Sequence, residues 1–326
     1  MGFAVDVRNL TKRYGEIVAL DSVSFGVNQG EVFGFLGPNG AGKTTTIRLL
    51  TGQIKPTSGV AMVAGYSVIH ESTKAKTHIG VVPEVSNLYD EMDAWSNLIF
   101  AAELYRVPKN ERDKRTKDLL ELFGLYERRM SRVGTFSRGM KRRLTIAAAL
   151  IHEPDILFLD EPTTGLDVQS SRTIRNLIKE LNKNGTTVFL TTHYIEEADQ
   201  LCQRVAMINQ GRIATVGAPE KLKASVEQHQ IIEISFSPAE NLEHKLADIN
   251  HVNKVLQVGD KFRLHVERTS QVIPLLVSFA KENDLEIISI NTLRPSLEDV
   301  FVEITGIAVE AMAREKEQAK RGENLG

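Results

Sequence analysis

The stretch "GPNGAGKT", Gly37 to Thr44, decides the fold. It matches G-x-x-x-x-G-K-[ST], the pattern of a glycine loop whose backbone amides surround a phosphate. The run "EVFGFL" before it predicts a strand and "TTIRLLTG" after it predicts a helix, the context that this pattern requires. The alternative, a chance glycine turn before a helix, is disfavoured because pattern and context agree. The residues expected to contact a nucleotide here are Gly37, Pro38, Asn39, Gly40, Ala41, Gly42, Lys43, Thr44 and Thr45.

Lys43 and Thr44 have chemical roles in such a loop. A lysine at this position reaches the β- and γ-phosphates of a nucleoside triphosphate, and the threonine hydroxyl binds Mg²⁺. The helix that follows adds partial positive charge at its N-terminus, which also favours an anion. The loop therefore predicts a nucleoside triphosphate and Mg²⁺ as ligands.

Carboxylates that hydrolysis needs follow a second apolar strand, "ILFLDEP", residues 156–162. Asp160 stands at the strand end, where an aspartate holds the metal of a P-loop enzyme. Glu161 comes next and is predicted to take a proton from the attacking water. Two adjacent carboxylates at a strand end can also form a simple turn, but the glycine loop upstream favours the catalytic interpretation. Lys43 is also expected to be catalytic, because it would contact the γ-phosphate.

Alternation of short β-branched runs with helical patterns from Ala4 to about Gly217 predicts an α/β domain built largely on parallel strands. "TTVFLTTH" is a further apolar strand that ends in polar residues, at the edge of the sheet where ligands of such folds bind. The segments "SNLIFAAELYRV" and "ERDKRTKDLLELFGL" predict amphipathic helices within an inserted helical subdomain at about 85–152. The first domain is expected to span residues 1–222.

The character of the chain changes after that domain. The order strand, helix, two strands, helix, strand predicts a small α+β domain of split-βαβ type at 223–306. Ser296 and Asp299 have the spacing of a capping box. Four histidines stand singly and are expected at the surface or in loops: His229, His244, His251 and His265. The charged tail, 307–326, predicts an exposed helix that frays.

Charge and composition exclude several classes of protein. Lysine and arginine number 40 against 42 acidic residues, so there is no global footprint of a nucleic-acid-binding protein. The single cysteine, Cys202, excludes an internal disulfide framework and is expected to be buried. No run approaches about 18 apolar residues, so we expect a chain that does not span a membrane by itself.

The order of glycine loop, "FSRGM", "LFLDEPTTGLD" and "TTH" resembles the ATP-binding subunits of ABC transporters, from about Val5 to Pro219. This resemblance implies ATP with Mg²⁺ and a dimer that holds two ATP molecules between two such domains. It implies that Tyr14 stacks on adenine, although a packed hairpin aromatic is the alternative. Asp167 would lie at the dimer seam, and His193 would reach the γ-phosphate.

"FSRGM" is a variant of the family's signature. It keeps Ser137 and Gly139, which would contact the phosphate of the nucleotide on the second subunit. Arg138 and Met140 replace the common glycine and glutamine, and Arg138 with Lys141 adds cations that favour an anion. Arg142 and Arg143 are expected on a solvated helix face. The variant resembles that of the ABC-2 export class, and "RPSLEDVFVEITG" resembles the end of the C-terminal domain in that class.

Glu84 is a departure from the family pattern. It stands where a glutamine that senses the γ-phosphate and Mg²⁺ is expected, so we predict a functional residue that binds metal but adds repulsion near phosphate. The segment just beyond, about Val85 to Tyr105, would form the groove that receives a helix of a membrane subunit. Trp95 in this segment is expected to pack in the core rather than to contact that partner.

The resemblance implies an ATPase that powers export through a separate membrane-spanning permease, at the cytoplasmic face of a membrane. The permease would bind the transported substrate, which the sequence does not identify. Homodimer and heterodimer both stay open, with the homodimer expected. The alternatives are a soluble P-loop ATPase acting on ribosomes or DNA, and a regulatory protein that has lost hydrolysis. A single P-loop, the balanced charge and the intact catalytic set disfavour both. The C-terminal domain is expected to regulate or to stabilise the dimer.

Overall fold

The computed structural model describes residues 2–225, 230–238, 242–293 and 296–306. These fall into two compact units that divide between Ala218 and Pro219. The boundary predicted at 222/223 lies inside helix α8 (Pro219–Ser225). The predicted tail, 307–326, lies outside the described residues.

The first unit is built on a six-stranded sheet with the order β10-β9-β3-β8-β7-β6. Neighbouring strands are parallel except for the antiparallel pair β9 and β10, which confirms the predicted parallel α/β sheet. Strands β3, β7 and β8 are buried along their whole length, as expected of strands covered on both faces. The strands are β3 (Val32–Leu36), β6 (Ile79–Val82), β7 (Ile156–Asp160), β8 (Thr187–Thr192), β9 (Arg204–Asn209) and β10 (Arg212–Gly217).

A second, antiparallel sheet with the order β2-β1-β4-β5 is an addition to the predicted architecture. Its strands are β1 (Val5–Tyr14), β2 (Ile17–Val27), β4 (Ser58–Val63) and β5 (Tyr66–Ser67). The two sheets share one core, in which Phe25 of β2 stacks on Phe33 of β3 with ring centroids 5.6 Å apart. Phe189 of β8 stacks on Phe25 from the same core, at 6.0 Å. Aromatic packing between the sheets therefore fixes the position of β3, which leads into the glycine loop.

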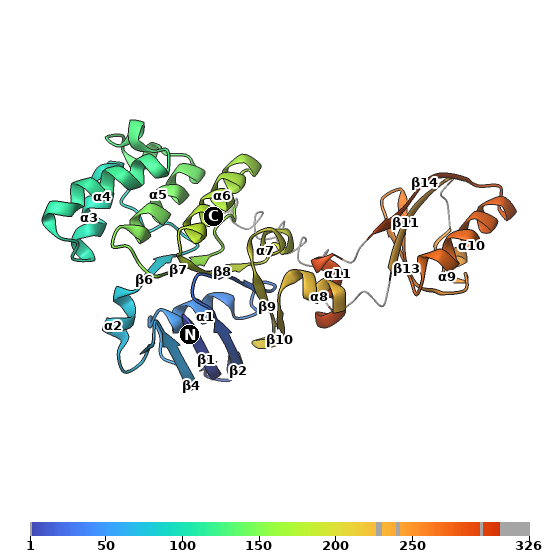
Figure 1. Ribbon diagram of the computed structural model, residues 1–326, viewed down its shortest axis with the longest axis horizontal. Coiled ribbons are helices and arrows are strands. Elements are labelled where there is room, and N and C mark those ends of the chain that lie inside the picture. The colour runs from blue at the N-terminus through green and yellow to red at the C-terminus, as the bar shows by residue number, and fades with distance from the viewer. Residues whose placement is uncertain (1, 226–229, 239–241, 294–295, 307–326) are drawn as a thin grey trace. The chain divides into compact units, whose positions relative to one another are not determined.

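Helices cover the sheets and form the predicted helical subdomain. They are α1 (Lys43–Leu50), α2 (Ser72–Thr77), α3 (Ala94–Leu104), α4 (Lys109–Leu122), α5 (Arg138–Leu150), α6 (Val168–Lys183) and α7 (Ile195–Leu201), with 3₁₀ turns η1 (Tyr126–Arg128) and η2 (Val133–Thr135). In Figure 1, α3, α4 and α5 lie together as a helical layer away from β1, β2 and β4. None of the helices that the structure describes combines the length and the apolar character needed to cross a bilayer.

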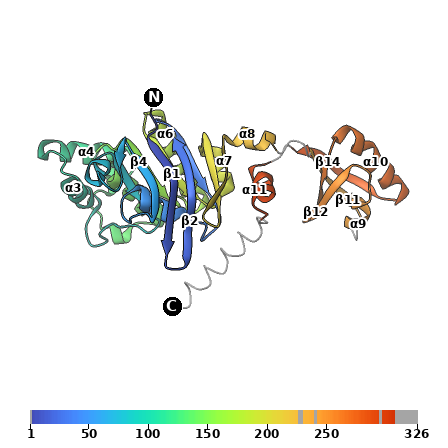
Figure 2. The same ribbon diagram turned by 90° about the horizontal axis from the view of Figure 1, so that it is seen from below.

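The second unit contains a four-stranded antiparallel sheet with the order β12-β13-β11-β14, the split-βαβ topology that the sequence predicts. Its elements are α8 (Pro219–Ser225), β11 (Gln230–Ser237), α9 (Glu243–Ala247), β12 (Val252–Val258), β13 (Lys261–Val266), α10 (Thr269–Glu282), β14 (Glu286–Leu293) and α11 (Leu297–Thr305). Figures 1 and 2 show α9 and α10 on one side of this sheet, where they bury a core around Phe262 and Leu276.

Several local predictions are confirmed. Ser296 and Asp299 form the expected capping box at the start of α11. Cys202 is buried. His244 and His251 are exposed and His265 is half-buried, while His229 lies outside the described residues.

Candidate nucleotide-binding site

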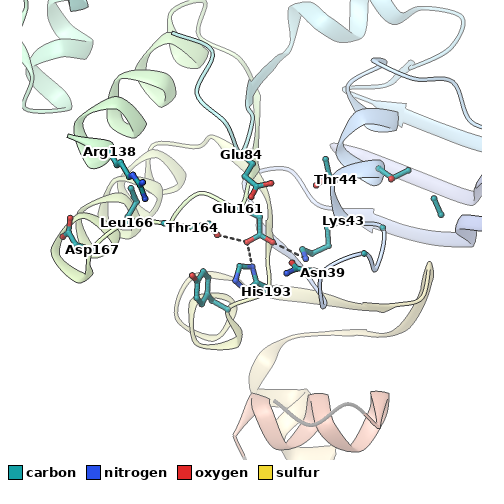
Figure 3. Close-up of a pocket in the computed structure, with 16 residues that line it drawn as sticks. Asn39, Lys43, Thr44, Glu84, Arg138, Glu161, Thr164, Leu166, Asp167 and His193 are labelled. Atoms are coloured by element: carbon teal, nitrogen blue, oxygen red, sulfur yellow. Dashed lines mark hydrogen bonds and ion pairs between the residues drawn. The ribbon is translucent and has the colours of Figure 1, made fainter. Parts of the chain in front are cut away.

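A cleft of about 770 Å³ opens beside the carboxyl ends of the parallel strands, where the sequence places the site. Loops that follow β3, β6, β7 and β8 line it together with Arg138 at the start of α5. Figure 3 shows Lys43 and Thr44 on one side and Arg138 with Leu166 on the other. Glu161 lies between them, with Glu84 beside it.

The glycine loop is shaped by two close approaches of its backbone. A Cβ on Gly37 would lie 2.3 Å from the carbonyl oxygen of Ile208, so only glycine fits there. Gly42 has φ 107°, and a Cβ on it would lie 2.7 Å from the carbonyl oxygen of Ala19. Helix α1 begins at the next residue, so its first backbone N–H groups face the loop. The loop has the geometry of a phosphate cradle.

Lys43 is buried at the base of the loop. Its ammonium donates hydrogen bonds to the carbonyl oxygens of Gly37 and Pro38, at 2.9 and 3.0 Å. The other predicted residues that line the cleft are Asn39, Gly40, Gly42, Thr44 and Thr45. Gly37, Pro38 and Ala41 do not line it, and Ala41 is buried.

Glu161 is the centre of the site. Its Oε1 lies 3.2 Å from Nζ of Lys43, and its Oε2 lies 2.7 Å from Nδ1 of His193 and accepts a hydrogen bond from the Thr164 hydroxyl at 3.1 Å. Burial alone raises the pKa of Glu161, but the hydrogen bond and charge of His193 with the charge of Lys43 outweigh it, and the pKa falls to about 2. The carboxylate is therefore ionised at neutral pH, and Nδ1 of His193 carries the proton of the bond between them.

The backbone of Glu161 is strained, with φ 48° in a residue that is not glycine. Neighbouring strand β8 holds it in place, because its N–H donates to the carbonyl oxygen and to Oγ1 of Thr191, at 3.2 and 3.1 Å. This conformation turns the carboxylate out of the sheet and into the cleft (Figure 3).

Oxygen atoms converge next to Glu161. Oδ1 of Asp160 accepts hydrogen bonds from Oγ1 of Thr191 at 2.6 Å and from Oγ1 of Thr44 at 3.4 Å. Hard oxygen donors of this kind suit Mg²⁺. This ion usually retains several bound water molecules and binds the substrate phosphates as well. In the described parts of the chain, no cluster of three or more histidine, cysteine or acidic residues forms a metal cage. The residues therefore fit a metal that is held together with a nucleotide.

Glu84 lines the same cleft, as the prediction of a functional residue requires. Partial burial, together with the nearby carboxylates of Glu161 and Asp160, raises the pKa of Glu84. The repulsion predicted between Glu84 and a bound phosphate stays a prediction.

The signature segment begins α5. Ser137 is the N-cap, and its Oγ accepts a hydrogen bond from the N–H of Met140 at 3.2 Å. Its hydroxyl hydrogen is not used in that bond. Packing requires glycine at position 139, which the sequence did not indicate. A Cβ there would lie 2.4 Å from Oγ of Ser170 on α6. Ser170 in turn donates from its N–H and hydroxyl to Asp167, the N-cap of α6.

The three cations that follow Arg138 in the signature helix, Lys141, Arg142 and Arg143, differ in their surroundings. Lys141 forms an ion pair with Asp90 at 2.8 Å, so part of its charge is neutralised within the chain. Arg142 was predicted on a solvated face, and this is wrong: only 7% of it is exposed. Arg143 is half-buried and donates to the carbonyl oxygen of Phe123 at 2.7 Å, which also contradicts the prediction. Both arginines find backbone carbonyl partners that lie far away in the sequence.

Tyr14, Ser137 and Gly139 are not among the residues that line the cleft. Tyr14 ends β1 at the tip of the β1–β2 hairpin, where it is half exposed and Lys12 lies over its ring. Its stacking on adenine therefore stays a prediction. The contact of Ser137 and Gly139 with the nucleotide of a second subunit also stays a prediction, while Arg138 between them lines this cleft.

Sequence reasoning missed three residues of the site. Thr164 bonds Glu161, Thr191 bonds both Asp160 and the Glu161 backbone, and Arg142 holds the loop that carries both carboxylates. The threonines stand beside motif residues, in "DEPTTG" and "LTTH", and polar residues at buried strand ends are the signal that indicates them. Arg142 carried no such signal.

A separate groove of about 330 Å³ lies on the helical subdomain. Phe100, Leu104 and Tyr105 of α3 and its end line it with Tyr89. Leu104 is 67% exposed, and Tyr89 and Tyr105 beside it in the groove are also exposed. Trp95 is half-buried and does not line the groove.

Comparison with known proteins places the chain in one family. A model described as ABC transporter matches residues 20–164, and one described as the C-terminal domain of DrrA1-3-like ATP-binding proteins matches residues 217–305. The linearmycin resistance ATP-binding protein LnrL of Bacillus subtilis is 37% identical over 305 residues, covering 93% of this chain and 98% of that protein. The doxorubicin resistance ATP-binding protein DrrA of Mycobacterium tuberculosis is 37% identical over 318 residues, covering 95% and 96%.

The Nod factor export ATP-binding protein I of Cupriavidus metallidurans is 36% identical over 303 residues, covering 93% of this chain and 97% of that protein. Among solved structures, an ATP-binding subunit of an ABC transporter matches with a TM-score of 0.63 and 29% identity, covering 69% of this chain and 93% of that one. A dimeric ATP-binding cassette in a post-hydrolysis state with ADP and Pi matches with a TM-score of 0.60 and 30% identity, covering 66% and 98%.

These relatives support the role of a transporter ATPase and not that of a ribosomal or DNA-acting ATPase. The chain therefore belongs to the ATP-binding subunits of ABC transporters, in the ABC-2 exporter class with a DrrA-type C-terminal domain, and it hydrolyses ATP.

Proposed function

We propose that two copies of this chain close around two ATP molecules, that Glu161 promotes attack of water on the γ-phosphate, and that a separate permease uses the closure for export. The position of the Glu161 carboxylate between Lys43 and His193, at the mouth of the glycine loop, carries this proposal. The dimeric cassette among the structural relatives supports the twofold arrangement.

Binding of ATP changes the surroundings of Glu161 in the direction that catalysis needs. The γ-phosphate competes for the Lys43 ammonium, which otherwise pairs with Glu161, and it adds negative charge nearby. Both effects raise the low pKa of the carboxylate and make it a better base for the attacking water. His193, when protonated on both nitrogens, donates to Glu161 through Nδ1 and to the γ-phosphate through Nε2.

Mg²⁺ fits the oxygens of Thr44 and Asp160, with Glu84 as a further ligand. When bound, this ion neutralises charge on the β- and γ-phosphates of the substrate. Glu84 brings a negative charge to a position next to Glu161 and Asp160, so we propose that it couples metal binding to closure of the site. If Glu84→Ala leaves both the Mg²⁺ dependence and the turnover unchanged, this role is withdrawn.

The second copy completes each site. Ser137 and Gly139 begin α5, whose N-terminus offers backbone N–H groups to an anion, and Asp167 is exposed on the rim of the cleft. We propose that Ser137 and Gly139 contact the γ-phosphate bound by the partner and that Asp167 lies at the seam.

The groove on α3 is the proposed seat of the permease. Its exposed Tyr89, Leu104 and Tyr105 form an apolar surface next to the loop that carries Glu84, so a helix seated there would sense the nucleotide. This contact would hold the chain at the cytoplasmic face of a membrane. Linearmycin, doxorubicin and Nod factor are cargoes named for the relatives, and we propose that this chain also serves export of a cargo that the permease selects.

The C-terminal domain is proposed to regulate the ATPase or to stabilise the dimer. The test uses a chain that ends at Ala218, the boundary between the two units. A chain cut after residue 222 would keep part of α8 but lose α11, against which α8 packs. Unchanged folding, dimerisation and ATPase regulation in the shortened chain would contradict this role.

Hydrolysis itself is tested by Glu161→Gln. We expect turnover to fall at least ~100-fold, the low end for a lost general base, while ATP still binds. A variant that retains hydrolysis would contradict the role of Glu161.

A further inference from the structure

Arg142 joins three parts of the proposed ATP site that are far apart in the sequence. Its Nη2 donates to the carbonyl oxygens of Asp160 and Glu161, both at 2.7 Å, and its Nε donates to that of Pro162 at 2.8 Å. Its Nη1 donates to the carbonyl oxygens of Pro83 and Glu84. One side chain of the signature helix therefore holds the backbone of both the metal-binding strand end and the Glu84 loop.

We propose that Arg142 is a positioning residue that sets the backbone of Glu161 and Glu84 relative to α5, the helix that begins with Ser137 and Gly139. This inference rests on the proposed function of the site. Its consequence is that a shift of α5 toward the nucleotide of the second subunit moves the hydrolytic carboxylate of its own chain.

The cost of burying this guanidinium supports a specific role. Only 7% of Arg142 is exposed, and among the residues that the structure describes it forms no ion pair with a carboxylate. The nearby carboxylates of Asp160 and Glu84 favour its charge, but burial opposes it, and a well-packed apolar side chain of similar volume often stabilises a fold as well as a buried ion does. The fork of the guanidinium does what such a side chain cannot, because its five N–H groups reach carbonyls in several directions at once.

The peptide that Arg142 holds is the strained one. Glu161 has φ 48°, and its carbonyl oxygen accepts from Arg142 while its N–H is held by Thr191. Strain of this kind persists only when the surroundings fix the backbone from both sides. Loss of the Arg142 bonds should therefore release Glu161 toward a relaxed conformation, in which its carboxylate no longer points between Lys43 and His193.

Arg143 offers a matched control one residue away. It stands on the same helix and donates to the carbonyl oxygen of Phe123, at 2.7 Å, within the helical subdomain. It does not line the cleft. Arg143→Met removes the same groups from the same helix without touching the backbone of Glu161 or Glu84.

Arg142→Lys separates charge from geometry. It keeps the positive charge near Asp160, Glu161 and Glu84, but its single ammonium cannot span the carbonyls of both segments. If charge alone mattered, this variant would behave like the natural chain. It also keeps the test valid if Arg142→Met fails to fold.

The experiment uses the full chain and its variants Arg142→Lys, Arg142→Met, Arg143→Met and Glu161→Gln. Turnover, KM and the affinity for a fluorescent ATP analogue with Mg²⁺ are measured, together with hydrogen exchange of the peptide that covers residues 160–164. We expect turnover of both Arg142 variants to fall ~10- to 100-fold, the size of effect that follows a small misplacement of a catalytic group. Affinity should stay within ~3-fold, as for an interaction that acts on the transition state.

Exchange of the 160–164 peptide should accelerate in Arg142→Lys and stay unchanged in Arg143→Met. Full turnover in Arg142→Lys, or equal losses in Arg142→Lys and Arg143→Met, would overturn the inference while leaving the proposed function intact. Retained hydrolysis in Glu161→Gln would instead contradict the proposed function itself.

Discussion

The ammonium nitrogen of Lys43 lies 3.2 Å from Oε1 of Glu161, and both side chains are buried. The residue that we propose to bind phosphate and the residue that we propose to activate water are thus an ion pair within the same chain. A γ-phosphate must draw Lys43 toward itself, which weakens the hold of Lys43 on Glu161. On the proposed mechanism, this contact couples substrate binding to activation of the base.

Lys43→Met should therefore impair binding as well as turnover. A lost hydrogen bond between charged groups is worth about 1.5–3 kcal/mol, so affinity for ATP should fall by ~10-fold or more. Titration with a fluorescent ATP analogue measures this, with Glu161→Gln as the variant that keeps its affinity. Equal affinities of the Lys43→Met variant and the natural chain would contradict the phosphate-binding role of Lys43.

The lowered pKa of Glu161 predicts a specific dependence of stability on pH. The folded-state pKa is about 2 and the ordinary value is 4.5, so the stability that the ionised carboxylate contributes is fully present above about pH 4.5. It is lost as pH falls through 2. In urea unfolding, the free energy of the natural chain should fall more steeply between pH 4.5 and 2 than that of Glu161→Gln.

Glu196→Gln is the control in this series, because it also removes one negative charge but at an exposed position on α7. Parallel curves for the natural chain and Glu161→Gln would show that Glu161 has no lowered pKa.

Gly139→Ala tests the contact between the signature helix and α6. The new Cβ would lie 2.4 Å from Oγ and 2.8 Å from Cβ of Ser170, and overpacking of this kind costs ~1–3 kcal/mol in the free energy of unfolding. Ser170→Gly removes both atoms and should restore most of that stability in the double variant. The free energy of unfolding is measured for the natural chain, both single variants and the double variant, which completes a double-mutant cycle. If the two single changes simply add in the double variant, the contact is contradicted.

Leu104→Glu tests the groove of the helical subdomain. A charge on this exposed leucine should abolish co-purification of the proposed membrane-spanning permease from detergent extracts, while ATPase activity of the isolated chain stays within ~2-fold. Leu122→Glu, on α4 and outside the groove, is the matched control. Loss of the membrane protein in both variants, or in neither, would contradict docking at this groove.

Local signals in the sequence predicted the centre of the site. Lys43, Asp160, Glu161 and His193 each follow an apolar strand, and parallel strands bring their carboxyl ends together whatever the rest of the chain does. The split-βαβ topology followed equally from the order of its strands and helices. The site residues and this topology can each be predicted from short stretches of sequence, without knowledge of which distant segments come into contact.

Other features depend on contacts between distant segments. A run of cations at a helix start indicates a solvated face, yet Arg142 is buried because the carbonyls of the Pro83 and Asp160 segments surround it. Nothing near Gly139 in the sequence indicates Ser170. The antiparallel β1–β2–β4 sheet escaped the prediction because β1 shows neither the continuous burial of β3 nor a regular alternation, and its pairing with β2 has register shifts.

Steady-state hydrolysis by Glu161→Gln, measured beside its affinity for ATP with Mg²⁺, tests the central claim most directly. The account predicts turnover at least ~100-fold below that of the natural chain, with the affinity unchanged. Turnover near that of the natural chain, in a variant that binds ATP equally well, would contradict the assignment of Glu161 as the residue that activates water.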